Sequence, residues 1–231
     1  MLRLLLISSL FIAQAHAEIS LGGFAGSISA EQNDLNRMMA RSNTRAGGIP
    51  TSALNSALEL AAYFQYRVDK SIWAFQIKPS YVFKTSSGSG GTNAFAGKYS
   101  YGVQGVTVAA ITKLYALEGK YLRLYFSGGL NYGSMAATIQ EVGFNVKASR
   151  SSMGFEFGTG LEFTFGNHGI LFDATLRQLS INRMTVDSTS GTAESGSASQ
   201  YGDGQELELD NSDLGTTFSG MRVSLGYAYY F

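Results

Sequence analysis

Apolar and polar residues alternate one by one over long stretches of this chain, and this alternation constrains the fold more than any other feature. Every second residue from Met221 to Phe231 is apolar or aromatic, and the residues between are mostly small or polar. The same pattern occupies 153–165, 122–132 and 73–83. Successive side chains of a β-strand point to opposite faces, so a period of two predicts strands with one apolar face.

Eight segments carry this signal, and we predict eight strands. Their approximate ranges are 18–28, 52–68, 71–86, 97–116, 121–139, 150–166, 169–186 and 214–231. The connections alternate between long and short. The long ones cover about 29–51, 87–96, 140–149 and 187–213, and the short ones are Val68–Lys70, Leu117–Lys120 and Gly166–Gly169. The apolar face changes parity near Gln104–Gly105 and Leu179–Ser180, which predicts β-bulges there.

The first seventeen residues are predicted to be a cleaved secretion signal. A short basic start at Met1–Arg3 is followed by the apolar run Leu4–Ile12, and Ala15-His16-Ala17 has the form of a cleavage site. This run is too short to span a bilayer as a helix, and no apolar stretch of 18 residues follows it. We therefore expect one exported domain over 18–231.

Composition narrows the class of that domain. The formal net charge is zero, which argues against a nucleic-acid partner, and the absence of cysteine excludes disulfides, thiolate metal sites and a lipidated Cys anchor. The strands of a soluble β-sandwich also alternate apolar and polar residues, but several strands predicted here exceed the usual length of five or six residues. Their polar faces combine glycines with charges of both signs, which suits a crowded lumen. We predict an all-β fold, a closed antiparallel transmembrane β-barrel, because a sheet in a membrane must leave no open edge.

The end of the chain resembles the carboxy-terminal signal of Gram-negative outer-membrane proteins. The residues that carry the resemblance are Val223, Leu225, Tyr227, Tyr229 and Phe231. It implies recognition by the barrel-assembly machinery and an integral outer-membrane location amid lipid and lipopolysaccharide. With its even strand number and alternating loop lengths, the mature chain is similar to the small OmpA/OmpX/OmpW type, which implies that both termini are periplasmic.

Strand parity places many charged residues inside the predicted barrel. They are Glu59, Arg67, Lys78, Lys113, Arg123, Glu156, Glu162, Asp173, Arg177 and Arg222, accompanied by Gln65, Gln76 and Asn131. Two interpretations remain open: a salt-bridge network that plugs the barrel, or a narrow water-filled path with weak ion preference. Aromatic residues near the strand ends are expected to form an interfacial girdle; they are Tyr66, Trp73, Tyr115, Tyr121, Tyr227 and Tyr229.

The two longest loops contain the remaining candidate features. Leu35, Met38 and Met39 have helical spacing, with Asn33 or Asp34 as the expected N-cap, which predicts either a short helix that covers the barrel mouth or a flexible loop. Arg37, Arg41 and Arg45 would lie near lipid phosphates if this helix lay on the membrane. The last loop is acidic, but Asp210–Asp213 lacks the Gly and Glu of a calcium loop, so we expect no metal and no cofactor.

We predict a non-enzymatic role, structural or as a narrow passive channel. The mature chain has one histidine, His168, which lies in a predicted periplasmic turn and leaves a serine nucleophile without an evident base. Two alternatives are a surface adhesin acting through loops 29–51 and 187–213, and a homo-oligomer packed through Gly128, Ala110 and Ala62 and holding lipid.

Overall fold

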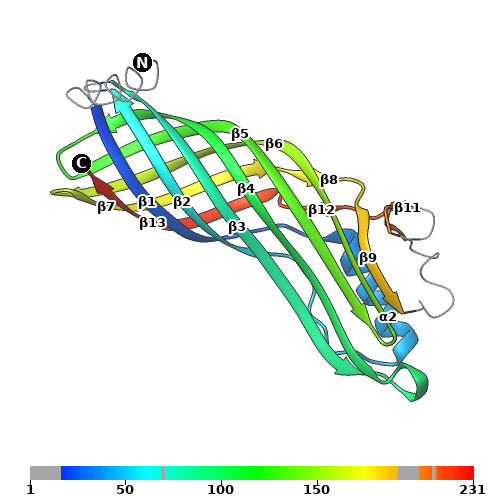
Figure 1. Ribbon diagram of the computed structural model, residues 1–231. Helices are drawn as coiled ribbons and strands as arrows, with labels where there is room; N and C mark the ends of the chain where they lie inside the picture. Colours follow the sequence, from blue (N-terminus) through cyan, green and yellow to red (C-terminus); the bar gives the residue numbers. More distant parts are fainter. Residues whose placement is uncertain (1–16, 69–70, 192–202, 210–211) are drawn as a thin grey trace.

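Eight antiparallel strands form a closed ring in the computed structural model, which describes residues 17–68, 71–191, 203–209 and 212–231 (Figure 1). The ring order is β1, β2, β3, β4, β5, β6, β7, β13, and β13 pairs with β1 to close it. The bounds are β1 Ala17–Ile28, β2 Ala57–Val68, β3 Trp73–Gly90, β4 Gly97–Glu118, β5 Leu122–Glu141, β6 Phe144–Phe165, β7 His168–Gln178 and β13 Gly220–Tyr230. The predicted eight-stranded barrel is confirmed.

The ring has one low side and one tall side. We call the end where β1 begins and β13 ends the lower end; it is at the upper left of Figure 1. The end where the helix α2 (Asn33–Ala46) lies is called the upper end and is at the lower right of Figure 1. At the upper end β3 to β6 continue far past β1, β7 and β13. The predicted long loops 87–96 and 140–149 are therefore wrong in large part. β3 and β4 pair up to Gly90 and Gly97 around the short 3-10 helix η2 (Asn93–Phe95), and Val142-Gly143 alone joins β5 to β6.

The predicted bulge at Gln104–Gly105 is also wrong. β4 pairs with β3 and with β5 through this region without a register shift, and the shift on β4 lies between Tyr115 and Leu117. Odd-numbered residues of β4 point inward from Tyr99 to Tyr115, but above Gly105 the inward residues are apolar and the outward ones polar. The apolar pattern changes parity because the surroundings change, while the strand remains regular.

At Leu179 the strand is interrupted. β7 ends at Gln178, and the short β8 (Ser180–Ile181) pairs with β12 (Thr216–Thr217) in the same register that β7 keeps with β13. β9 (Thr185–Gly191) then pairs with the upper part of β6, where a shift falls between Lys147 and Ala148. β10 (Glu208–Leu209) and β11 (Ser212–Asp213) form a two-stranded ribbon, so the last connection is partly ordered sheet.

The helix α2 covers the inner face of the tall side. Leu35, Met38, Met39 and Ala46 are buried against an apolar cluster that includes Tyr99, Val146 and Phe218. This confirms a short helix in the first long connection, and its packing favours the capping interpretation over the flexible loop. The N-cap is Gln32, without a side-chain capping bond, so the expected cap at Asn33 or Asp34 is wrong. Gly47 ends the helix in the left-handed conformation, φ 76°.

The outer wall of the lower ring is covered with exposed apolar side chains, such as Phe75, Leu130, Phe157 and Leu225. Such a large apolar surface suits contact with lipid chains. Within the described residues, no helix is long and apolar enough to cross a membrane. Residues 1–16 of the proposed signal peptide lie outside the described residues. Its last residue, Ala17, is the first residue of β1 and pairs with Val68 of β2.

Candidate functional site: the filled lumen and the upper cleft

The ten charged residues assigned to the lumen all point into the ring. Arg123 keeps 16% of its side chain exposed, and the other nine are buried. In the middle of the barrel Arg177 Nη2 lies 2.7 Å from Glu59 Oε1, and Lys78 Nζ lies 2.5 Å from Glu156 Oε1. Further ion pairs join Arg222 to Asp173, Arg222 to Glu59 and Arg177 to Glu156. The strands β2, β3, β6, β7 and β13 are thereby connected across the lumen.

A second network closes the lower end. Arg67 forms a bidentate pair with Glu118, with N–O distances of 2.7 and 2.6 Å. Arg123 pairs with Glu18 at 2.8 Å and with Glu162 at 3.1 Å. Glu18 and Glu118 were missing from the sequence prediction, although Glu18 shares the parity of Ser20, which is buried. With them, the described lumen holds six cations and six carboxylates.

Tyrosines fill the space between the two networks. Tyr115 and Tyr125 are buried, and the Tyr115 hydroxyl donates to Glu162 while the Tyr125 hydroxyl donates to Asp173. The assignment of Tyr115 to the interfacial girdle is therefore wrong. Its ring points into the lumen, and the register shift of β4 comes only after it, between Tyr115 and Leu117. Lys113 Nζ lies 4.2 Å from the Tyr125 ring centroid, a cation–π contact.

Little space remains at the centre of the lumen. The cavity beside Lys78, Lys113 and Arg222 has a volume of about 10 Å³. A volume of this size holds about one water molecule. This cavity has no room for a hydrated ion or a larger solute.

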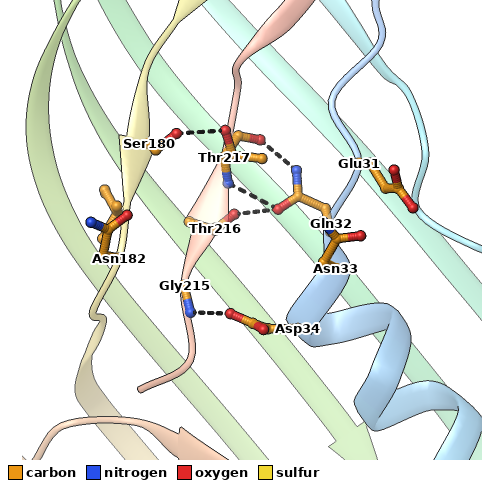
Figure 2. Close-up of a pocket in the computed structure, with 10 residues that line it drawn as sticks. Glu31, Gln32, Asn33, Asp34, Ser180, Asn182, Gly215, Thr216 and Thr217 are labelled. Carbon is orange, nitrogen blue, oxygen red and sulfur yellow. Dashed lines mark hydrogen bonds between the residues drawn. The ribbon is translucent and has the colours of Figure 1, made fainter. Parts of the chain in front are cut away.

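A cleft of about 370 Å³ opens at the upper end, between the start of α2 and the β8–β12 pair (Figure 2). Sequence reasoning did not find it because its walls come from segments far apart in the chain. Its lining is mostly polar; the lining residues are Glu31, Gln32, Asn33, Asp34, Ser180, Ile181, Asn182, Gly215, Thr216 and Thr217. The arrangement offers hydrogen-bonding groups to a small molecule at the barrel mouth.

One carboxylate fastens α2 to the tall wall. Glu141, near the tip of β5, accepts hydrogen bonds from Ser42 and from the Tyr101 hydroxyl, and it forms an ion pair with Arg45 at 2.7 Å. Burial and the neighbouring carboxylate raise the pKa of Tyr101. The tyrosine therefore stays a hydrogen-bond donor, and the contact fixes the helix in place.

The acidic residues of the last connection are gathered around one arginine. Carboxylate oxygens of Glu206, Glu208 and Asp213 lie within 4.8 Å of one another. Arg183 pairs with Glu206 at 2.8 Å and with Asp213 at 2.9 Å, and these hydrogen bonds raise the pKa of its guanidinium. The calcium-loop comparison rested on Asp210 and Asn211, which lie outside the described residues.

The remaining predicted positions lie on the outer wall. The five residues of the proposed assembly signal all face outward; they are Val223, Leu225, Tyr227, Tyr229 and Phe231. His168 stands at the lower end, where its Nδ1 is hydrogen-bonded to the Tyr227 hydroxyl. Ala62 and Ala110 also face outward, and Ala110 borders a wall groove of about 240 Å³ formed with Phe64, Phe75 and Ile77.

The closed ring, its apolar outer wall and its polar lumen define an integral outer-membrane β-barrel. Among solved structures, a major outer membrane protein of Thermus thermophilus is similar over 93% of this chain and 99% of its own, with a TM-score of 0.56 at 12% identity. Ail, the attachment invasion locus protein of Yersinia pestis, is similar over 94% of this chain and 99% of its own, with a TM-score of 0.47 at 15% identity. Neisserial surface protein A is similar over 93% of this chain and 99% of its own, with a TM-score of 0.39 at 10% identity. Neither a protein-family model nor a curated protein matches the sequence.

Proposed function

We propose that this protein is a structural, non-conducting barrel of the outer membrane that presents an ordered platform at its upper end. The observation that carries the proposal is the filled lumen. Paired charges and tyrosine rings leave about 10 Å³ beside Lys78, Lys113 and Arg222. Of the two interpretations of the lumenal charges, the plug is the better supported, because an ion path needs continuous water.

The orientation follows from the same proposal. Both termini lie in the periplasm, and α2 and the upper cleft face the outside, as expected for a barrel with short periplasmic turns and long outer connections. Outer-membrane lipid and lipopolysaccharide surround the apolar wall, and the barrel-assembly machinery reads the last strand. His168 then lies at the periplasmic end, remote from the outer surface, which supports a non-enzymatic role.

Planar-bilayer recording of the folded mature protein tests the closed lumen. We expect no reproducible conductance steps from the natural chain. The double variant Tyr115→Ala/Tyr125→Ala should conduct, because it removes two rings that fill the lumen, and heat-modifiable gel mobility checks that it folds. If the natural chain gave conductance steps, and if an Arg222→Gln variant changed their size, the plug would be refuted and the passive-channel interpretation would be supported.

A second role, surface binding, is favoured by one specific observation. The first and the last outer connections meet at the upper cleft, where Gln32 and Asp34 bond to the segment 215–217. Under this proposal the two loops act together as one contact surface. Adhesion of cells that carry the protein, compared with cells carrying a variant that lacks 31–46, measures this role, and equal adhesion would count against it.

A further inference from the structure

The upper cleft lies where a ligand from outside can reach it. It is situated just beyond the upper ends of β1, β7 and β13, on the low side of the ring, while β3 to β6 continue upward on the other side. Its volume of about 370 Å³ falls within the range of small-molecule sites, roughly 300–1,000 Å³. The cleft is therefore large enough for a ligand of about the size of a sugar unit.

The base of the cleft is held by hydrogen bonds that need no ligand. Gln32 is buried, and its Nε2 donates to the Thr217 carbonyl at 2.5 Å. Its Oε1 accepts from Thr216 Oγ1 at 2.7 Å and from the Thr217 amide at 3.1 Å. Asp34 accepts from the Gly215 amide at 2.9 Å, as Figure 2 shows. A base that is already fixed loses little conformational entropy on binding.

Three exposed side chains on the rim are left for a ligand. Glu31, Asn33 and Asn182 make no hydrogen bond with the described residues through their side chains. Figure 2 shows Asn182 on the β8 side and Glu31 with Asn33 on the α2 side. The two amides supply donors and acceptors, and the carboxylate supplies acceptors. The free groups thus lie on the two sides of the segment 215–217 that forms the base of the cleft.

The charge of the lining selects the ligand class. Glu31 and Asp34 are acidic, and none of the ten described lining residues is Lys, Arg or His. Arg37 pairs with Asp34 at 3.4 Å, so Glu31 is the main source of the negative charge that disfavours phosphate, sulfate and carboxylate ligands. An ammonium ion would use the acceptors only and leave both amide NH₂ groups unpaired, whereas a sugar hydroxyl both donates and accepts.

We propose that the upper cleft binds an uncharged sugar through its hydroxyl groups, with Glu31, Asn33 and Asn182 as the contacting side chains. This inference rests on the proposed role of the barrel as an outer-surface platform. The sugar comes either from the glycolipid of the same membrane or from a glycan outside the cell.

Saturation-transfer NMR tests the site with the full mature protein in phospholipid nanodiscs. The probes are glucose, galactose, mannose and N-acetylglucosamine, with glucose 6-phosphate and N-acetylneuraminic acid as charged counterparts. We expect transfer to at least one neutral sugar, at least fivefold weaker in Asn182→Ala and in Glu31→Ala. Gln140→Ala, an exposed amide near the tip of β5, is the matched control and should be unchanged. Transfer to no neutral sugar, stronger transfer to the charged probes, or transfer in both cleft variants equal to that of the natural chain would overturn the proposal.

Two further measurements distinguish the source of the sugar, and they distinguish failure of the sugar site from failure of the proposed closed barrel. Lipopolysaccharide included in the nanodiscs should lower transfer to the free sugar if the membrane's own glycolipid occupies the cleft, and leave it unchanged if an external glycan does. Heat-modifiable mobility confirms that each variant is folded. A barrel that is silent in bilayers but binds none of the sugars would overturn the sugar site and leave the closed structural barrel standing.

Discussion

The lower and the upper parts of the barrel interior are filled by opposite kinds of side chain. The lower part holds six cations and six carboxylates among the described residues, together with tyrosines. The upper part, enclosed by β3 to β6, β9 and α2, holds an apolar cluster that includes Leu35, Met38, Met135 and Phe218. Outside, the order is reversed, because apolar residues cover the lower wall and polar ones the upper.

The difference shows that the surroundings of a strand decide which of its faces is apolar. Burying an apolar side chain is favourable when it leaves water, so the upper part is stabilised like a soluble protein. In the lower part the apolar face leaves water for lipid and not for the interior, so the hydrophobic effect does not stabilise the packing of the lumen. The interior of the lower part therefore depends on its closed hydrogen-bonded ring and on the ion pairs that join most of its charged side chains.

The largest expected effect comes from breaking that pairing at Arg177. Arg177→Met leaves Glu59 and Glu156 without their closest shared cation, and removing one partner of a buried ion pair costs about 3–5 kcal/mol. Urea unfolding in lipid vesicles, followed by the single tryptophan Trp73, should show a loss of this size.

A matched control for Arg177→Met is the same substitution at Arg183. Arg183 also pairs with two carboxylates, but 48% of its side chain is exposed, so solvent screens these pairs and the stability should change much less than in Arg177→Met. The double variant Arg177→Met/Glu59→Leu should be more stable than Arg177→Met alone. Equal losses at Arg177 and Arg183 would show that the lumenal network contributes no more than surface pairs.

A smaller effect, confined to the upper part, is expected from Phe218→Ala. Phe218 is fully buried in the apolar cluster, and its removal should destabilise that cluster by about 3 kcal/mol through lost burial and the cavity left behind. Hydrogen exchange in α2 should accelerate, whereas the urea midpoint reported by Trp73 should move little. Phe126→Ala is the control, since that ring faces outward from β5 and leaves no internal cavity.

A large shift of the Trp73 midpoint in Phe218→Ala would mean that the two parts unfold as one unit. An unchanged exchange rate in α2 would instead mean that the apolar cluster does not hold the helix. Either result would remove the distinction between a soluble-like upper core and a membrane-type lower lumen.

Alternation alone was enough to predict the lower part of the fold. One face of each strand there is lipid-exposed and the other lumenal, so parity located the strands and put residues such as Glu59 and Arg222 inside. Parity did not say which charges pair, because Arg177 and Glu59 are 118 positions apart and meet only when the ring closes.

The upper part was predicted less well for the same physical reason. Ser87 and Gln140 belong to strands whose outward face meets water, and their polarity was interpreted as loop. The change of apolar face at Gln104 was interpreted as a bulge, although it marks the level where lipid gives way to water. The cleft depends on contacts between positions 32 and 217, which no local pattern contains.

The smallest effect is expected at Glu141, a buried carboxylate in the otherwise apolar upper region. Glu141→Gln keeps an acceptor for Ser42 and Tyr101 but removes the charge facing Arg45, so the cost should be about 1 kcal/mol. Glu141→Leu removes the acceptor as well and leaves the buried donors unpaired, which should cost about 2–3 kcal/mol. Hydrogen exchange at the C-terminal half of α2 measures both variants. If Glu141→Leu were as stable as Glu141→Gln, the apolar packing of Met38 and Met39 would suffice to hold the helix, and the carboxylate would contribute nothing to the contrast between the two parts.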